Sequence, residues 1–484
     1  MDASERVINR APWYGKKGRT MSGINSLLDI GRSALQAYQR ALTVTGQNIS
    51  NVNTPGYSRQ DVVLSERAPQ DEGTFLTGTG VEVAQIRRSF DAFIEGQLTT
   101  SQQRLGRQQV LKDTLSLTQG FFQDSDGEGL SAGLNDFFNA IQDVATNPSD
   151  VTSRSVLLSR AQTLAARFNA TAANLQAQRR SLDGQITQTV DDVNHLASQV
   201  ADLNGKIAQL EMGGQTASEL RDQRASLLNE LAQRIDTTAL EDGSGQVTVY
   251  VGRGQTLVTG RTAYHLKATP NPANSGFVDV QIEGNGPTPV TISSVISDGR
   301  LKGLLDSRDT TIPDLLDNLD TLASTLVTRV NQVHQAGFGL DGSTGSNFFT
   351  PTGLTAASIS VALTDSRKVA ASNSAGGLPG NNTNALVLAD LQNQTQAALG
   401  NTSFGDYYGG VAAGLGAMTQ NADRDLQAQQ IIDNQLQAHR AEVSGVSLDE
   451  ELIKMLQYQR AFEAASRVIV TTDQVFQTIL NLKQ

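Results

Sequence analysis

The chain of 484 residues contains no cysteine, which excludes disulfide bonds, thiolate metal ligands and cysteine nucleophiles. It also lacks any run of about 18 apolar residues, so we expect no membrane insertion. The N-terminal region has no apolar stretch of the kind found in a cleavable secretory signal. If the protein leaves the cell, we expect it to use another route.

Positive charge is scarce as well. There are 38 Lys and Arg residues against 49 Asp and Glu residues, and the net charge is -11. Phosphate groups are neutralised by a surplus of Lys and Arg, so this balance disfavours nucleic acid as a partner and also disfavours anionic membrane surfaces. At about 150 residues per domain, the length predicts roughly three domains.

Candidate catalytic groups are few. The four histidines are widely separated: His195, His265, His334 and His439. None has a second histidine or a carboxylate at a helical spacing that would form a metal-site motif, so we interpret them as solvated residues or residues at the edge of a helix seam. The segment GFGLDG (337–342) fits a dinucleotide-binding pattern but follows a helix instead of a strand. The segment DSDGEG (124–129) faintly resembles a calcium loop but lacks its closing Glu. We predict no active site, no metal and no cofactor.

Residues 1–20 differ from the rest of the chain. They hold five basic and two acidic residues, a surplus of +3, so the remaining residues carry -11 - 3 = -14. They include the only tryptophan and show no helical period. We interpret them as a disordered leader or a start-site artefact, with the patterned sequence beginning at Met21.

Both ends of the patterned chain show apolar residues at alternating spacings of three and four, which is typical of heptad helices. The N-terminal helix has two adjacent seams: Ile24, Leu27, Gly31, Ala34, Tyr38, Ala41, Thr45 and, beside them, Leu28, Leu35, Leu42, Ile49. The C-terminal helix has one: Met455, Tyr458, Phe462, Ala465, Ile469, Thr472, Phe476, Ile479. Ser447 followed by Glu450 fits a capping box at its start.

The middle of the chain is mainly helical with one change of period. Helices are predicted over 130–144, 151–211, 217–235, 312–335 and 407–443, and the second would reach about 90 Å at ~1.5 Å per residue. Between 237 and 300 the period becomes two, which predicts a small β domain. Residues 338–383 are interpreted as a surface excursion with one strand at ASISVAL (357–363), and helix resumes at Asn384.

These patterns predict a mainly α fold with a small β insert. The expected protein is elongated, with its terminal helices paired as a coiled coil and a body of long helices. The expected domains are a leader (1–20), a terminal assembly domain (21–65 with 440–484), a helical body (66–236 with 300–439) and an inserted β domain (237–299).

The two ends carry a more specific signal. The stretch NISNVNTPGYSRQ (48–60), with the helix before it, resembles the N-terminal signature of the bacterial flagellar axial proteins, the group of rod, hook and hook-associated components. The final helix, EELIKMLQYQRAFEAASRVIV and onward, is similar to the matching C-terminal signature. Internal stretches at 299–309, 331–349 and 366–392 are most similar to the hook-associated members at the hook-filament junction. The leader and the short region 350–365 depart from that pattern.

The resemblance implies a structural protein that polymerises at the hook-filament junction, adapts the hook to the filament and is not an enzyme. It implies as partners further copies of the chain, the hook protein, the next hook-associated junction protein and a cytoplasmic export chaperone at the C-terminal helix. Export in an unfolded state to the extracellular flagellum is implied too. The alternatives are a secreted axial-type protein with a peptidase variable region, and a free adhesin or cytoplasmic coiled-coil scaffold.

The assembly interface is predicted on both terminal helices and on the turn after the first. Its expected residues are Ile24, Leu27, Leu28, Leu35, Tyr38, Leu42, Asn48, Ile49, Asn51, Pro55, Gly56, Tyr57, Leu452, Met455, Tyr458, Phe462, Ile469, Phe476 and Ile479.

Overall fold

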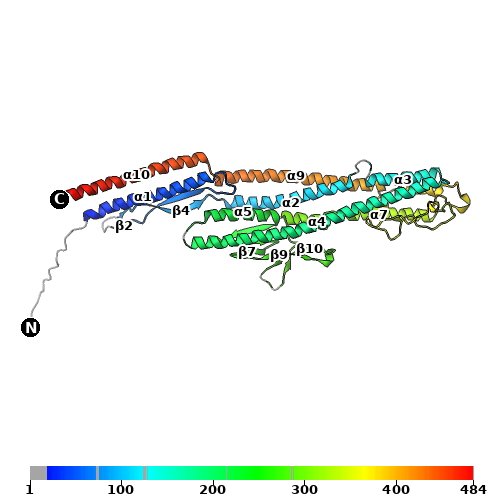
Figure 1. Cartoon of the computed structure of the whole chain (residues 1–484), viewed down its shortest axis with the longest axis horizontal. Coiled ribbons are helices and arrows are strands. Elements are labelled where there is room, and N and C mark those ends of the chain that lie inside the picture. Colours follow the sequence, from blue (N-terminus) through cyan, green and yellow to red (C-terminus); the bar gives the residue numbers. More distant parts are fainter. Residues whose placement is uncertain are drawn as a thin grey trace, which may run out of the picture. The chain divides into compact units, whose positions relative to one another are not determined.

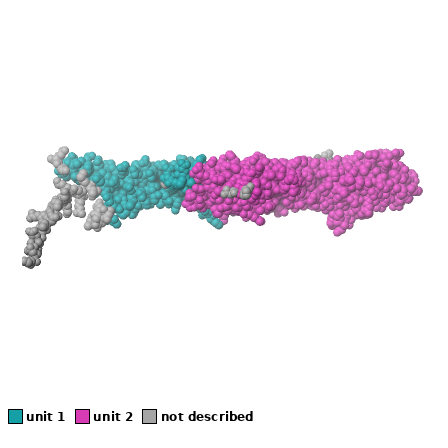
Figure 2. Space-filling view, turned by 90° about the horizontal axis from the view of Figure 1, so that it is seen from below, with its two compact units in different colours: residues 1–95, 206–225, 437–484 teal, residues 96–205, 226–436 magenta. Residues whose placement is uncertain are grey.

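The fold is mainly helical with a few small sheets, as predicted (Figure 1). The structure, a computed structural model, describes residues 19–71, 76–123, 127, 129–213, 215–284, 286 and 288–482. The predicted leader therefore lies almost wholly outside the described residues. The chain forms two compact units (Figure 2): unit 1 holds 1–95, 206–225 and 437–484, and unit 2 holds 96–205 and 226–436. This grouping places 66–95 and 206–225 with the terminal segments, whereas the sequence had suggested the helical body.

Ten α-helices are described: α1 (Arg19–Ser50), α2 (Ala92–Phe122), α3 (Leu130–Thr146), α4 (Val151–Met212), α5 (Ser218–Arg234), α6 (Gly299–Asp306), α7 (Ile312–Gln335), α8 (Thr383–Asp390), α9 (Phe404–Ser444) and α10 (Leu448–Asn481). The strands are β1 (Gln60–Glu66), β2 (Gln70–Asp71), β3 (Leu76–Thr77), β4 (Val81–Arg88), β5 (Thr237–Glu241), β6 (Val247–Val251), β7 (Gln255–Thr259), β8 (Thr262–Ala263), β9 (His265–Pro270), β10 (Val278–Glu283) and β11 (Val290–Thr291). The helices predicted over 151–211 and 312–335 are confirmed as α4 and α7, whereas α2 was not predicted.

Two antiparallel sheets of unit 2 pack beside α4. Their strand orders are β5-β6-β7-β8 and β11-β10-β9. Asn204 donates to Val247 O at 2.7 Å and accepts from Val247 N at 3.1 Å, and Asn194 makes the same pair of bonds with Leu266 at 2.8 and 2.7 Å. Each amide thus forms the two bonds that a neighbouring strand would form, and this attaches the sheets to the helix.

The segment 338–383 differs from its prediction in two respects. The expected strand at 357–363 is wrong: among the described residues this stretch forms only an isolated β-bridge, between Val361 and Phe349. The segment is also not confined to the surface. Phe348 and Phe349 are buried and lie edge-on or tilted against Phe137, with ring centroids 5.8 and 5.7 Å away. The two aromatic side chains bury this segment although its composition is polar.

His334 is a buried residue of α7, so its interpretation as a solvated or seam-edge histidine is wrong. Its Nδ1 lies 2.7 Å from Ser346 O, and its Nε2 lies 3.0 Å from the Ala370 N–H. These partners require a neutral ring that donates from Nδ1 and accepts at Nε2. Burial lowers the pKa of His334 to about 4, because a charged ring would lose its hydration and turn a second donor toward Ala370.

Because the buried ring of His334 is neutral, we expect the folded chain to lose stability in acid. The pKa in the folded chain lies below the ordinary value of about 6.5, so the unfolded chain binds more protons between these values and stability falls as the pH is lowered. From pH 7 to pH 5 we expect the unfolding free-energy difference between wild type and His334→Gln to shrink by about 2 kcal/mol. Urea unfolding at both pH values measures it, with the exposed His195→Gln as a control for losing a histidine. A difference that does not change with pH would contradict the neutral buried ring.

Candidate assembly interface

Helices α1 and α10 lie along each other in unit 1 (Figure 1). The ring centroids of Tyr38 and Tyr458 are 6.4 Å apart. A Cβ added to Gly31 would lie 2.7 Å from Ile469 Cγ1, so the absence of a side chain at this position allows the close approach of the helices. Ala465 is buried in the same seam. The spacing of three and four residues on each helix therefore corresponds to one continuous contact.

Asn48 is the central polar residue of this contact. Its side chain is 1% exposed. Its Nδ2 donates to Gln60 O at 2.9 Å and to Glu451 Oε2 at 2.8 Å. Its Oδ1 accepts from Gln60 N at 3.0 Å and from the Tyr57 hydroxyl at 2.9 Å. The four bonds use the full capacity of the amide. One side chain thereby joins the end of α1, the start of β1 and the first turn of α10.

Glu451 continues the polar network on α10. It is 0% exposed, and its Oε1 lies 3.1 Å from Lys454 Nζ, which in turn lies 2.7 Å from Asp61 Oδ1. Burial raises the pKa of Asp61, yet the hydrogen bond and charge of Lys454 outweigh burial and hold that pKa below its ordinary value. Burial lowers the pKa of Lys454, and its bonds to Asp61 and Glu451 raise it overall. Both groups therefore stay charged near neutral pH.

The turn after α1 is fixed by further contacts. Tyr57 N donates to Thr54 O at 3.2 Å, and Gly56 has a φ of 80° after Pro55, as in a type II turn. Arg440 Nη2 donates to Gly56 O at 3.2 Å. Burial, followed by the nearby Asp222 carboxylate, raises the pKa of Tyr57 to about 12, so its hydroxyl keeps the proton that it donates to Asn48.

Asp222, at 7% exposure, binds the next residue, Ser58, and also Arg88 of β4. Its carboxylate accepts from Ser58 N at 2.9 Å, from Ser58 Oγ at 2.8 Å and from Arg88 Nη1 at 2.7 Å. Neither Asp222 nor Arg88 was predicted, because both look like ordinary charged residues in the sequence. Glu451 was missed too, although it stands four residues before Met455 at a seam position. The signal that could have identified Glu451 is the presence of an acidic residue in an otherwise apolar seam.

The predicted interface residues differ in exposure. Asn48 is buried, and Pro55, Leu27, Leu452 and Ile479 are exposed. The half-buried ones are Ile24, Leu28, Leu35, Tyr38, Leu42, Ile49, Asn51, Gly56, Tyr57, Met455, Tyr458, Phe462, Ile469 and Phe476. Helix α10 and the residue that follows it also expose large apolar side chains that were not predicted: Leu448, Ile453, Leu456, Val468, Val470, Val475, Leu480 and Leu482. One face of α10 therefore packs on α1, while the apolar side chains outside this contact, here called the second face of α10, have no partner within the described chain.

The turn gives a testable effect of backbone conformation. A Cβ on Gly56 would meet no atom within 4 Å, so Gly56→Val is strained only by its φ of 80°. We expect a loss of about 1 to 3 kcal/mol in the free energy of unfolding. Gly46→Val is the matched control, because Gly46 also meets no atom within 4 Å and lies inside α1. Equal stability of the two variants in thermal unfolding would show that this turn tolerates a side chain.

The described residues offer little else for chemistry. They contain no group of three or more His, Cys, Asp or Glu side chains arranged to hold a metal ion. No described helix combines the length and the hydrophobicity needed to cross a membrane. The polar network around Asn48, with the two helices that it joins, is therefore the arrangement on which a function is argued.

Comparison with known proteins shows that Asn48 and Glu451 each lie in a segment that matches a flagellar protein family. Residues 28–57 match the flagella basal body rod protein family, residues 437–482 the C-terminal family of the flagellar basal body rod FlgEFG proteins, and residues 115–349 the helical domain of flagellar hook-associated protein FlgK. Flagellar hook-associated protein 1 of Bacillus subtilis is 31% identical, over 94% of this chain and 97% of its own. That of Escherichia coli is 25% identical, over 95% and 100%.

A solved structure shares the fold. The flagellar hook junction protein FlgK from Burkholderia pseudomallei superposes with a TM-score of 0.65 at 17% sequence identity. The match covers 72% of this chain and 100% of that one.

Proposed function

This chain belongs to the flagellar hook-associated protein 1 family, and we propose that it polymerises at the hook-filament junction and adapts the hook to the filament. Membership of the family makes it a structural component of the flagellum. The observation that carries the finer proposal is the buried network of Asn48 and Glu451, which joins the two segments matched by rod-protein families.

The network supports assembly because it fixes how the terminal helices align. A buried polar contact between two helices disfavours other registers, since a shift would leave the amide and the carboxylate without partners. We infer that α1 and α10 pair as a coiled coil in the register set by Asn48 and Glu451. A fixed register gives every copy the same exposed surface, which is required of a subunit that repeats in a symmetric assembly.

The second apolar face of α10 supports self-association. Leu452 and Leu456 are 49% and 56% exposed, and Val475 and Ile479 are 48% and 47% exposed. Exposed apolar side chains grouped at the start and at the end of one helix are consistent with an interaction site. We propose that neighbouring copies, the hook protein and the next hook-associated junction protein cover it, and that the predicted interface residues on α1 and α10 take part.

Before assembly the same face needs protection. We propose that an export chaperone binds the C-terminal helix in the cytoplasm, and that the chain is exported unfolded, without a cleaved signal, to the extracellular flagellum. In this role the chain is not an enzyme, and no observation on the described residues favours a peptidase.

Immunogold electron microscopy of flagella tests the proposal. Antibody against the folded body of the chain is expected to label one short zone between hook and filament, and deletion of the coding sequence is expected to leave hooks without filaments. Label along the filament, or normal filaments after deletion, would contradict a junction role.

A further inference from the structure

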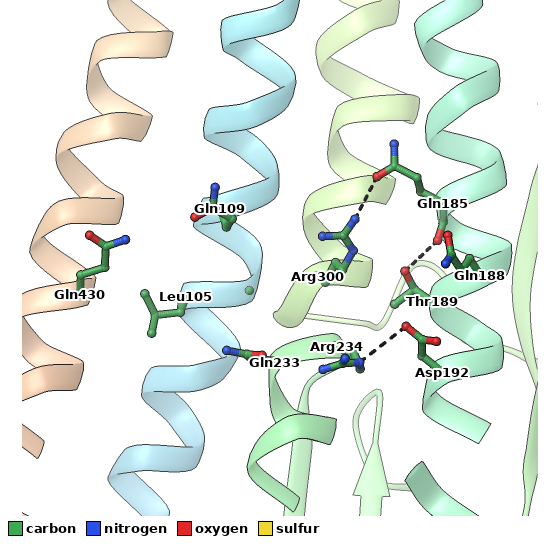
Figure 3. A pocket seen from close by; sticks show the side chains of 11 residues that line it. Leu105, Gln109, Gln185, Gln188, Thr189, Asp192, Gln233, Arg234, Arg300 and Gln430 are labelled. Atoms are coloured by element: carbon green, nitrogen blue, oxygen red, sulfur yellow. Dashed lines mark hydrogen bonds and ion pairs between the residues drawn. The ribbon is translucent and has the colours of Figure 1, made fainter. Parts of the chain in front are cut away.

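A polar pocket opens in unit 2 between helices α2, α4, α5, α6 and α9 (Figure 3). Its volume is about 470 Å³, within the range of roughly 300 to 1,000 Å³ typical of small-molecule sites. Five of its lining residues are glutamines, and Leu105 is its only large apolar one. Sites for apolar ligands are lined mainly by hydrophobic and aromatic side chains, so this lining favours a polar ligand.

A close helix contact forms one wall of the pocket. A Cβ on Gly106 of α2 would lie 2.0 Å from Gln233 O and 3.1 Å from Arg300 N. Glycine therefore lets α2 approach the end of α5 and the start of α6. Any larger residue would push these backbones apart, so the pocket shape depends on this position.

The pocket carries positive charge in an acidic chain. Arg234 and Arg300 face a single carboxylate, that of Asp192, whereas the whole chain has a net charge of -11. Figure 3 shows both arginines between α2 and α4, with Gln185 and Asp192 opposite them. An excess of guanidinium groups in a concave site attracts anions.

The two guanidinium groups are only partly satisfied within the described chain. Arg300 Nη2 donates to Gln185 Oε1 at 3.0 Å. Arg234 Nη1 donates to Glu230 O at 3.0 Å, whereas Arg234 Nε lies 3.7 Å from Asp192 Oδ2, too far for a hydrogen bond. This Nε is buried and has no acceptor among the described residues. Guanidinium groups bind carboxylates through two parallel N–H donors. Within the described chain one terminal nitrogen of each arginine donates to a protein acceptor, Arg234 Nη1 and Arg300 Nη2, so the other terminal nitrogen can face such a ligand.

We propose that this pocket binds a small, hydroxyl-rich carboxylate of the uronic acid class. Its carboxylate lies between Arg234 and Arg300, which supply the charge-assisted hydrogen bonds. Its hydroxyls contact glutamine amides such as those of Gln188 and Gln430, because an amide offers both a donor and an acceptor to a hydroxyl group. Asp192 accepts from a further hydroxyl and disfavours ligands with a second negative charge.

Titration of the full chain with sodium D-glucuronate, followed by calorimetry and by NMR line broadening of the sugar, tests the pocket. We expect saturable binding with a Kd of about 1 mM, as is usual for a ligand of this size. D-glucose, which has the same ring without the carboxylate, is expected to bind at least about tenfold more weakly, because the charge-assisted bonds are lost.

Substitutions of the two arginines test whether glucuronate binds in this pocket. Arg300→Gln and Arg234→Gln are each expected to weaken glucuronate binding about tenfold or more. Arg104→Gln removes the same charge from an exposed residue of α2 outside the lining and is expected to leave the Kd unchanged. Absence of saturable glucuronate binding overturns the proposal. Equal binding of D-glucose, or an equal loss in Arg104→Gln, overturns it as well.

Discussion

Replacing Asn48 with aspartate is expected to separate α1 from α10 and to abolish filament attachment. Asn48 Nδ2 lies 2.8 Å from Glu451 Oε2, and the two side chains are 1% and 0% exposed. The variant Asn48→Asp places two carboxylates at that distance without water between them. Disrupting a buried charged contact costs about 3 to 5 kcal/mol, comparable to the whole stability of a small domain. Limited proteolysis of the purified chain and electron microscopy of cells carrying the variant measure the two effects.

Two further variants show whether the Asn48–Glu451 contact is the cause. Asn53→Asp adds the same charge at an exposed position of the following turn and is expected to behave as wild type. In the double variant Asn48→Asp/Glu451→Gln the amide and the carboxylate exchange positions, so one hydrogen bond is retained with its direction reversed. We expect partial recovery of protease resistance. A single variant Asn48→Asp as resistant as wild type at neutral pH would show that this bond does not hold the helices together.

Much of the helical fold could be predicted because the apolar spacing reports burial along one side of a helix. Helices α4 and α7 were found in this way, and so was the start of α10, where the Ser447 side chain accepts from Glu450 N. Helix α2 was missed because several of its buried residues are polar. Thr118 is buried and hydrogen-bonds Gln178 of α4 at 3.0 Å. A buried threonine paired with a glutamine gives no apolar period.

The candidate assembly interface could likewise be predicted only in part from the sequence. The amide-rich turn around Asn51, Pro55 and Gly56 could be recognised because its residues are consecutive. Asp222 could not, since its bond to Arg88 joins residues 134 positions apart. The pairing of Asn204 with Val247 is likewise long-range. Local patterns specify which segments form helices, whereas the polar contacts that align those helices depend on side chains far apart in the chain.

A second prediction separates pairing within the chain from contact between chains. Val475→Asp and Ile479→Asp alter side chains that are 48% and 47% exposed on the second face of α10. In the free chain the new carboxylate remains solvated, so we expect the free energy of unfolding to change by less than about 0.5 kcal/mol. If neighbouring subunits cover this face, the same carboxylate becomes buried without a partner, which costs several kcal/mol. Cells are then expected to lose attached filaments and motility, as electron microscopy and soft-agar swarming would show.

Two comparisons make this test specific to the second face. Gln474→Asp adds the same charge beside Val475 at an exposed polar position and is expected to preserve motility. Ile469→Asp lies in the seam against Gly31, so it is expected to lower the stability of the free chain itself. Normal swarming of Val475→Asp and Ile479→Asp would mean that this face remains in contact with water in the flagellum. Loss of motility with unchanged chain stability, in cells that still export the variant chain, would place the subunit contact on the stripe formed by Val468, Val475, Ile479 and Leu482.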